Sequence, residues 1–277
     1  CLKTIIYSLL NIRKSCKIIL FFGGVTMEYK NMKKNLDVIL DNIVLLAEQF
    51  GFKEEIDKFT LMGLLISDGY LTKDRKFVTN EDILYRDLYD DIIFELGVVP
   101  FTGEGCCRHT TSLAKLILDR FNIENEVSAA LITDKEINSK ELIAVSDMVL
   151  QPLDCNHAVN IVKIDDRYMA FDVDVNKPIY LYSIKENKLT GFFQKESLNS
   201  SYLIYNYSPF FEGKRNFNSI TPLSILEQED IIRNHNNILL VARANIDLLE
   251  EFYTNNRPYM EEIDNSYKKI LVKEKRL

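Results

Sequence analysis

The segment from Gly103 to Leu118 contains the residues best suited to do chemistry. Its sequence, GEGCCRHTTSLAKLIL, places two adjacent cysteines, Cys106 and Cys107, where a glycine-containing loop becomes an apolar helix. The first turn of a helix has unpaired backbone N–H groups and the positive end of the helix dipole, and both stabilise an anion. A thiol at such a position ionises readily and becomes nucleophilic. The segment therefore predicts a cysteine nucleophile for covalent catalysis.

A cysteine nucleophile needs a base, and the chain contains three histidines. His109 lies two residues after Cys107, on a different side of the same helical turn, and we interpret it as structural or as a neighbour of the site. His235 lies in a polar RNHNN run, which we interpret as a helix end. His157 opens the run AVNIVKI, which is rich in β-branched residues, so it is the candidate base at the start of a strand.

The strand that follows His157 is predicted to form a hairpin with the next one. The acidic pair at residues 165–166 separates AVNIVKI from RYMAFDVDV, and this pattern is typical of two strands joined by a tight turn. A two-residue turn pairs Ile164 with the residue after the turn. This register places His157 opposite Asp174, with Asp172 one diagonal step away on the same face. Either carboxylate is then within reach of the imidazole and can orient it.

The helix segment resembles the transglutaminase-like superfamily, which has a papain-like cysteine enzyme core. The family pattern is a glycine, any residue, the catalytic cysteine, often an arginine, and a hydrophobic helix that ends in a glycine-isoleucine pair. Gly105, Cys107, Arg108 and Ile123 match these positions. The family isoleucine lies sixteen residues after its cysteine, and 123 minus 107 is sixteen. This register selects Cys107 rather than Cys106, which we interpret as a packing residue behind the helix start.

The resemblance extends to the strand pair. The sequence HAVN, which starts at His157, and the sequence FD, which ends at Asp172, are similar to the family's histidine-alanine-tryptophan-asparagine strand and its return strand. Fifteen residues separate His157 from Asp172, a common spacing in the family. The resemblance therefore implies a catalytic triad of Cys107, His157 and Asp172, with Asp174 as the alternative orienting group.

The chain also departs from the family pattern. Asn122 replaces the usual glycine at the end of the helix, which is tolerated because Asn also adopts the left-handed conformation at a C′ position. The chain has no tryptophan, so Val159 and Tyr168 stand where the family commonly has one, and no indole is available to hold an oxyanion. The backbone N–H of Cys107 is the oxyanion donor that we expect first, and the sequence identifies no second donor.

The same residue types give a competing hypothesis, because cysteine and histidine are also zinc ligands. Cys106, Cys107 and His109 at the helix start, with Cys155 and His157 at the strand, form two clusters that are expected to converge. Paired ligands of structural zinc sites are usually separated by two to four residues, so that both turn toward one metal. Adjacent cysteines diverge on a helix. We therefore favour the nucleophile and predict no metal and no cofactor.

Composition excludes several classes of protein. The chain has 277 residues, is 47% hydrophobic and contains 16 Phe and 14 Tyr, so it can bury a sizeable core. Its net charge of −7 and the lack of a basic stripe with interleaved aromatic residues exclude a typical nucleic-acid-binding protein. Five cysteines are too few and too clustered for a disulfide-stapled secreted module. We therefore expect a cytoplasmic protein with no membrane partner.

Residues 1–26 are interpreted as a leader that does not belong to the natural protein. Their apolar run is shorter than the roughly twenty residues that span a bilayer, and no small-x-small cleavage site follows it. We expect Met27 to be the natural start and Gly23-Gly24 to be a translated ribosome-binding sequence of a bacterial gene.

The remaining elements must position the catalytic residues. We predict an α+β fold, with a helical N-terminal region at 27–100, a transglutaminase-like catalytic core at 101–220 and C-terminal helices at 221–277. Within the core, the nucleophile helix packs on an antiparallel sheet. Hydrophobic spacing predicts further helices around residues 36–47, 59–67, 82–96, 223–233 and 238–253, a solvated helix from 259, and strands at 126–132 and 178–184.

The predicted function is acyl transfer. His157 removes the thiol proton or shares an ion pair with Cys107, Asp172 orients the imidazole, and the thiolate attacks an amide carbonyl to give a thioester. Water as acceptor makes the protein a peptidase, amidase or deamidase acting on a peptide or protein, and we expect this outcome because water needs no second binding site. The alternatives are a protein-glutamine transglutaminase and a non-catalytic scaffold of the same fold that binds a peptide.

Overall fold

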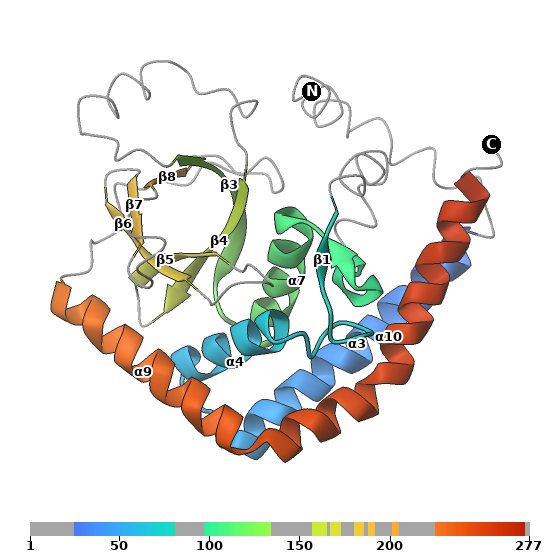
Figure 1. Ribbon diagram of the computed structural model, residues 1–277, viewed down its shortest axis with the longest axis horizontal. Coiled ribbons are helices and arrows are strands. Elements are labelled where there is room, and N and C mark those ends of the chain that lie inside the picture. The colour runs from blue at the N-terminus through green and yellow to red at the C-terminus, as the bar shows by residue number, and fades with distance from the viewer. Residues whose placement is uncertain are drawn as a thin grey trace.

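The computed structural model describes residues 25–80, 97–133, 157–164, 167–172, 180–185, 188–191, 201–204 and 225–274. They form an α+β fold, as the sequence predicts, in which a closed barrel of antiparallel strands lies beside a layer of helices (Figure 1). The helices are α3 (Val25–Phe50), α4 (Glu55–Ser67), η2 (Val99–Thr102), α7 (Cys107–Arg120), α9 (Ile225–Ala244) and α10 (Ile246–Glu274). Of the expected leader at 1–26, residues 1–24 lie outside the described residues, and Val25 and Thr26 begin α3. The expected helix at 82–96 also lies outside them.

The barrel contains six strands in the order β3-β4-β5-β6-β7-β8. They are β3 (Asn125–Thr133), β4 (His157–Ile164), β5 (Arg167–Asp172), β6 (Tyr180–Lys185), β7 (Lys188–Gly191) and β8 (Ser201–Ile204). The β4–β5 hairpin has the predicted register, with Ile164 opposite Arg167. The far half of β3 pairs with β8, from Ala130 opposite Ile204 onward, and this pairing closes the sheet. The predicted antiparallel sheet is confirmed, and its closure is an addition that strand patterns alone do not reveal.

Helix α7 packs between the barrel and the outer helices (Figure 1). Its Leu113 and Ile117 are fully buried, as expected from their spacing on one helical face. The side chain of Asn160 in β4 is also fully buried, and its Nδ2 donates a hydrogen bond of 2.9 Å to the carbonyl of Thr111 in α7. A buried amide that reaches a helix carbonyl fixes the position of α7 along β4, because a shift would leave this donor unpaired.

The C-terminal end of α7 confirms the conformation predicted for Asn122. This residue has φ of 60°, in the left-handed region. The N–H of Ile123 donates to Leu118 O at 2.9 Å and the N–H of Asn122 donates to Asp119 O at 3.0 Å, which are the two hydrogen bonds of a Schellman motif. Ile123 is buried and packs in the core with Leu118. The sharp end directs the chain straight back into β3.

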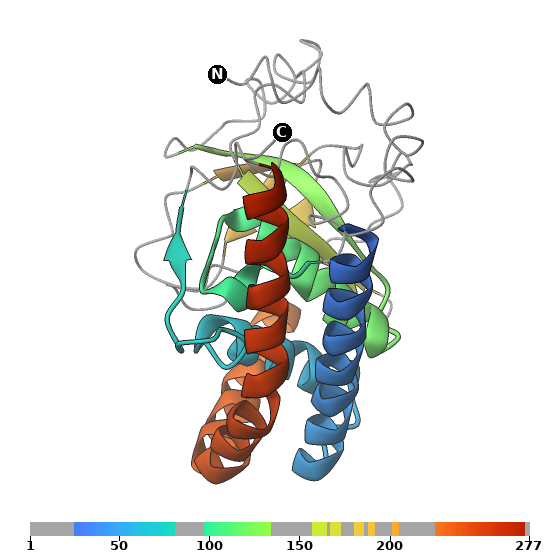
Figure 2. The same ribbon diagram turned by 90° about the vertical axis from the view of Figure 1, so that its right-hand side faces the viewer.

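The long helices α3 and α10 lie side by side and run in opposite directions (Figure 2). Asn42 Nδ2 donates to Asn256 Oδ1 at 2.7 Å, and Lys269 lies 3.9 Å from Glu28, so the start of α3 meets the end of α10. The helix predicted from residue 259 is present as part of α10, but the prediction that it is solvated is wrong. One face of that segment is buried against the rest of the molecule, through Met260, Ile263, Tyr267 and Ile270.

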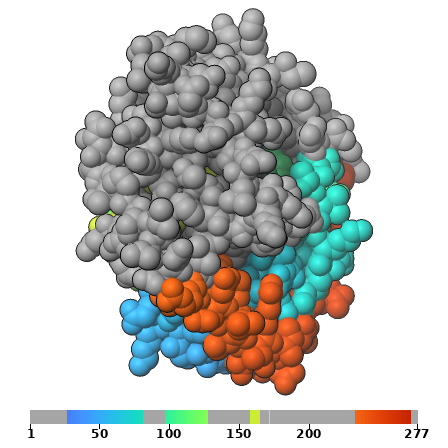
Figure 3. All heavy atoms as spheres, turned by 60° about the vertical axis from the view of Figure 1, so that its left-hand side comes forward, coloured from blue at the N-terminus to red at the C-terminus, as the bar shows by residue number. Residues whose placement is uncertain are grey.

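Helix α9 contradicts the interpretation of His235 as part of a helix end. The helix continues through this residue, and the break occurs at Asn245 instead. His235 is 6% exposed, with Nδ1 3.0 Å from Thr60 Oγ1 and its ring packed on the edge of Phe59. The neighbouring polar residues, such as Asn234 and Asn236, point to solvent, so the polar run belongs to the outer face of a packed helix. In Figure 3 the orange spheres belong to this C-terminal region and form part of the surface on the face shown.

Within the described part of the chain, none of the helices has the length and apolar character needed to cross a membrane.

Candidate functional site

The loop that leads to the two cysteines is held by a short parallel strand pair. Strand β1 (Val78–Thr79) pairs with β2 (Glu104–Gly105), which directly precedes Cys106. The N–H of Val78 donates to Gly103 O at 2.8 Å and the N–H of Asn80 donates to Gly105 O at 2.9 Å. Gly103 has φ of 87°, a backbone conformation that is strained for residues with a side chain. The turn before β2 therefore needs glycine.

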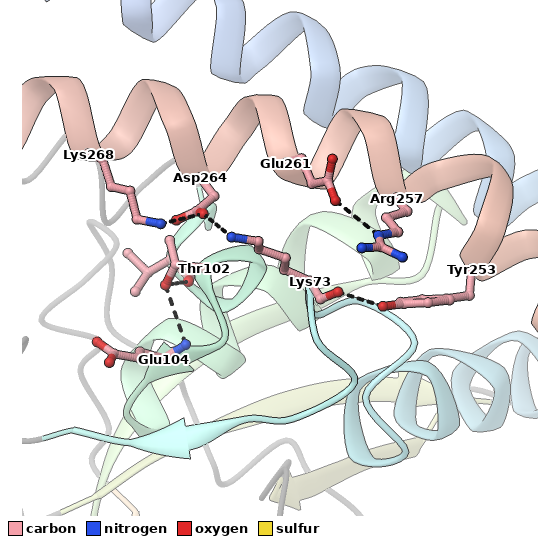
Figure 4. A network of polar contacts seen from close by, with 9 residues as sticks. Lys73, Thr102, Glu104, Tyr253, Arg257, Glu261, Asp264 and Lys268 are labelled. Atoms are coloured by element: carbon pink, nitrogen blue, oxygen red, sulfur yellow. Dashed lines mark hydrogen bonds and ion pairs between the residues drawn. The ribbon is translucent and has the colours of Figure 1, made fainter.

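Helix α10 packs against η2 and the segment before β1, close to the same loop (Figure 4). The buried carboxylate of Asp264 contacts the ammonium groups of Lys73 at 3.0 Å and Lys268 at 2.7 Å, both through Oδ2. The hydroxyl of Tyr253 donates to the backbone carbonyl of Lys73. Residue 73 lies just before β1 in the chain, so these contacts tie α10 to the strand that borders the cysteine loop.

The helix start separates the two cysteines into different environments. Cys106 is the N-cap residue, with φ of −140° and ψ of −179°, and Cys107 is the first residue of α7. Cys106 is 8% exposed, whereas Cys107 is only partly buried. Both are free thiols. Cys107, which the family register selects, is therefore the thiol that a reagent reaches more readily.

Cys106 forms a close pair with His109, which sequence reasoning treated as structural or as a neighbour of the site. The backbone N–H of Cys106 donates to His109 Nδ1 at 3.0 Å, and the Sγ of Cys106 lies 3.2 Å from the same nitrogen. His109 is 1% exposed. Gly105 leaves room for this pair, because a Cβ there would lie 3.0 Å from the Phe77 ring and 3.3 Å from the Cβ of His109. The N-cap to N3 spacing of a capping box is the sequence signal that predicts the contact.

The two thiols also interact, so the expectation that adjacent cysteines diverge is wrong. Cys106 is extended and lies outside the helix, and this geometry lets the Cys107 thiol donate a hydrogen bond to the Cys106 sulfur. That hydrogen bond is the largest cause that lowers the pKa of Cys106 to about 4; burial opposes it, and His109 and Arg108 add to it. Because the two thiols interact, their first ionisation belongs to the pair rather than to one sulfur.

The predicted base starts β4 at the same end of the structure. Helix α7 turns back into β3, and β4 is antiparallel to β3, so α7 and β4 run in the same direction. Their first residues are Cys107 and His157. The hydrogen bond from Asn160 to Thr111 lies three residues after His157 and four residues after Cys107. The topology thus brings the backbone of the predicted nucleophile and that of the predicted base to one end of the α7–β4 pair.

The predicted orienting residue follows the same register. Asp172 is the last described residue of β5, where it pairs with Tyr180 of β6. Its neighbour Phe171 pairs with Asn160, so Asp172 lies beside the first residues of β4. The alternative orienting residue Asp174 lies outside the described residues. At His157 and Asp172 the structure describes the backbone, and the assignment of their side chains to a triad remains a prediction.

The zinc hypothesis requires ligands from both the helix start and the β4 strand. Among the residues that the structure describes, no three His, Cys, Asp or Glu side chains are grouped so that they could hold a metal ion. Cys155, one of the ligands in that hypothesis, lies outside the described residues.

Comparison with known proteins finds no matching family model, no similar curated protein and no similar solved structure.

Proposed function

We propose that this protein is a cysteine-dependent acyl-transfer enzyme with a transglutaminase-like, papain-like core. The proposal assigns the nucleophile to Cys107, the base to His157 and the orienting carboxylate to Asp172. In this assignment the thiolate attacks the carbonyl of a peptide or side-chain amide, and the resulting thioester is released by water. Hydrolysis is the expected outcome, and transfer to an amine is the alternative outcome of the same chemistry.

One observation carries the proposal. A partly buried thiol begins α7, and the strand that begins with a histidine runs parallel to that helix from the same end. The hydrogen bond of 2.9 Å between Asn160 and Thr111 holds the two elements in this alignment. Two reacting groups from distant parts of the chain need such a fixed alignment, because catalysis depends on a preset geometry of nucleophile and base.

The electrostatics of the helix start support the same assignment. The backbone N–H groups of the first turn of α7 point toward its N-terminal end, where they stabilise a thiolate and the oxyanion of a tetrahedral intermediate. A hydrogen bond from the Cys107 thiol lowers the pKa of Cys106 to about 4, and this direction supports an anion at the helix start. A reducing compartment, as expected for a cytoplasmic protein, keeps both thiols available.

Selective alkylation tests the proposal. Iodoacetamide at neutral pH is expected to label Cys107 faster than the other cysteines, with the site of modification read from peptide mass spectra. His157→Ala is expected to slow the labelling and to lower kcat/KM by about 100-fold or more, since the base that takes the thiol proton is lost. Cys107→Ala is expected to abolish turnover with an unchanged circular dichroism spectrum.

Matched variants separate the triad from simple thiol reactivity. Cys106→Ser keeps Cys107 and the N-cap position, so most of the turnover should persist. Asp172→Asn and Asp174→Asn test the orienting carboxylate, and the correct one should lower kcat by about 100-fold or more. Equal, slow labelling of every thiol in the wild type, unchanged by His157→Ala, contradicts the enzyme and favours the peptide-binding scaffold.

The acceptor is identified from products. Mixed peptides and a primary amine are incubated with the protein and analysed by mass spectrometry. Cleaved or deamidated peptides indicate hydrolysis, whereas peptides joined to the amine through glutamine indicate transglutaminase activity.

A further inference from the structure

The cluster of Cys106, Cys107 and His109 contains more reactive groups than acyl transfer uses. One nucleophile is sufficient for a thioester, yet a second thiol accepts a hydrogen bond from the first, and a buried imidazole nitrogen lies 3.2 Å from the second sulfur. The two thiols differ in access, because Cys107 is partly exposed and Cys106 is 8% exposed. This arrangement pairs an outer thiol that reagents reach with an inner thiol that they do not.

We propose that hydrogen peroxide converts this cluster into a reversible disulfide between Cys107 and Cys106, with Cys106 as the resolving thiol and His109 as the acceptor of its proton. The inference does not require the proposed acyl-transfer activity, because it concerns the oxidation of the thiols themselves. It assigns a site of reversible oxidative modification to the start of α7.

The chemistry proceeds in two steps. In the first step the proton of the Cys107 thiol passes to the Cys106 thiolate, and the Cys107 thiolate that results attacks one oxygen of hydrogen peroxide, forming a sulfenic acid and releasing hydroxide. In the second step the Cys106 thiol passes its proton to the lone pair of His109 Nδ1, which then no longer accepts from the Cys106 N–H, and the Cys106 sulfur attacks the sulfenic sulfur. The S–O bond breaks, and the departing hydroxide takes the proton from His109 to become water. Two sulfur atoms are oxidised by one electron each, and the peroxide is reduced by two electrons.

The position of Cys106 favours the second step over further oxidation. The resolving thiol belongs to the neighbouring residue, so the step is intramolecular and does not wait for a second molecule. A second peroxide would instead produce a sulfinic acid, which is irreversible for most proteins.

The covalent geometry makes this disulfide easy to reduce. Adjacent Cα atoms are about 3.8 Å apart. This separation is shorter than the usual disulfide range of about 4.4–6.8 Å, so the bond is strained. Strained disulfides have oxidising potentials and are labile rather than structural. A thiol reductant in the cell is therefore sufficient to restore both thiols once the peroxide is consumed.

Peroxide titration of the full chain tests the inference. The protein is treated with hydrogen peroxide, the remaining thiols are alkylated, and the peptide that contains both cysteines is examined by mass spectrometry. The expected product has lost two hydrogens, has no alkylated cysteine and regains both thiols in dithiothreitol. In Cys106→Ser, which keeps the size and N-cap role of the residue, Cys107 is expected to accumulate as irreversible sulfinic acid at about tenfold lower peroxide.

A second variant tests the role of His109. His109→Asn offers an amide oxygen to the Cys106 N–H but no base, so the disulfide is expected to form about tenfold more slowly. If this variant unfolds, Cys106→Ser alone still decides the proposal. Sulfinic acid in the wild type at the same peroxide dose as in Cys106→Ser overturns the inference, and so does a disulfide from Cys107 to Cys155 or to a second chain. None of these readouts depends on enzymatic turnover.

Discussion

The thiol chemistry proposed for this protein depends on a few side-chain atoms of Cys106, Cys107 and His109 at the start of α7. The Sγ of Cys106 lies 3.2 Å from His109 Nδ1, and the Cys107 thiol and the backbone N–H of His109 also interact with it. A buried thiolate is costly unless donors surround it. Here the neighbouring thiol and the backbone N–H groups of the first helical turn supply those donors, so the charge is stable although the sulfur is shielded from water.

The first prediction concerns the pH at which this thiolate forms. Because the hydrogen bond from Cys107 lowers the pKa of Cys106 to about 4, one thiolate of the pair should be present at all pH values above that point. The pKa of an ordinary cysteine thiol is about 8.5, so its thiolate forms only near that pH. During an acid titration the ultraviolet absorbance of the thiolate should therefore fall with a midpoint near pH 4.

The control for this titration is Cys106→Ser. It leaves Cys107 without its partner thiol, so the low midpoint should disappear. A low midpoint that survives in Cys106→Ser would show that Cys106 does not carry the charge.

At the scale of elements, the two ends of α7 have different tasks. The N-terminal end of α7 carries the two thiols. At its C-terminal end the chain reverses, so that β3 runs back along the helix. That reversal depends on Asn122, which adopts φ of 60°. The alignment of α7 with β4 therefore depends on a left-handed residue that is far from the thiols.

The second prediction concerns Asn122. Asn122→Gly removes the residual strain of a left-handed side chain and should leave the free energy of unfolding unchanged or raise it by about 0.5 kcal/mol. Asn122→Val places a β-branched residue at the same φ and should lower it by about 1–2 kcal/mol. Urea unfolding monitored by circular dichroism measures both. Equal stability of the glycine and valine variants would contradict the Schellman end.

The third prediction concerns the contact between α9 and α4. Burial lowers the pKa of His235 from 6.5 to about 4. Above pH 6.5 the residue is neutral in both the folded and the unfolded chain, and between pH 6.5 and 4 only the unfolded chain binds the proton. Stability is therefore lost as the pH falls through this window, and the loss from this group is about 2 kcal/mol at pH 5.

His235→Asn is the matched variant for this measurement, because its amide can still meet Thr60 Oγ1 and does not titrate. Unfolding free energies at pH 7 and pH 5 should differ by about 2 kcal/mol less in the variant than in the wild type. The same dependence on pH in both proteins would show that His235 is accessible to protons in the folded state.

Across the whole molecule, the N-terminal and C-terminal helices form one support for the cysteine loop. Helix α10 packs against α3 on one side and contacts η2 and the segment before β1 on the other. The buried Asp264 joins these parts, because it accepts from Lys73 of that segment and from Lys268 of its own helix. Segments nearly two hundred residues apart, from 73 to 264, are thus in direct contact.

The fourth prediction concerns this contact. Asp264→Asn keeps the shape of the side chain but removes the charge that faces two ammonium groups, so it should lower the free energy of unfolding by about 2 kcal/mol. Glu261→Gln is the control, since it breaks an exposed pair with Arg257 on the same helix and should behave like the wild type. If both variants lose the same stability in urea unfolding, the buried contact has no special role.

Local sequence patterns determined the elements near the site. Two runs of β-type residues around an acidic turn predicted the β4–β5 hairpin with its register. The position of Asn122 at the helix end, where the resembled family has glycine, implied its left-handed conformation. Both depend on interactions between residues close in the chain, which a pattern of neighbours can encode. The position of Cys107 at the start of its helix follows from the same kind of signal.

Only the tertiary structure decided which side chains are buried and which groups meet. It placed His235 inside α9 against α4, buried one face of the helix predicted to be solvated, closed the sheet through β3 and β8, and turned Cys106 toward Cys107 and His109. These outcomes depend on partners from distant segments or on a backbone angle at a helix boundary. A polar run or an adjacent pair of cysteines has the same local pattern whether it is buried or exposed. Its burial depends on the distant segments that pack against it.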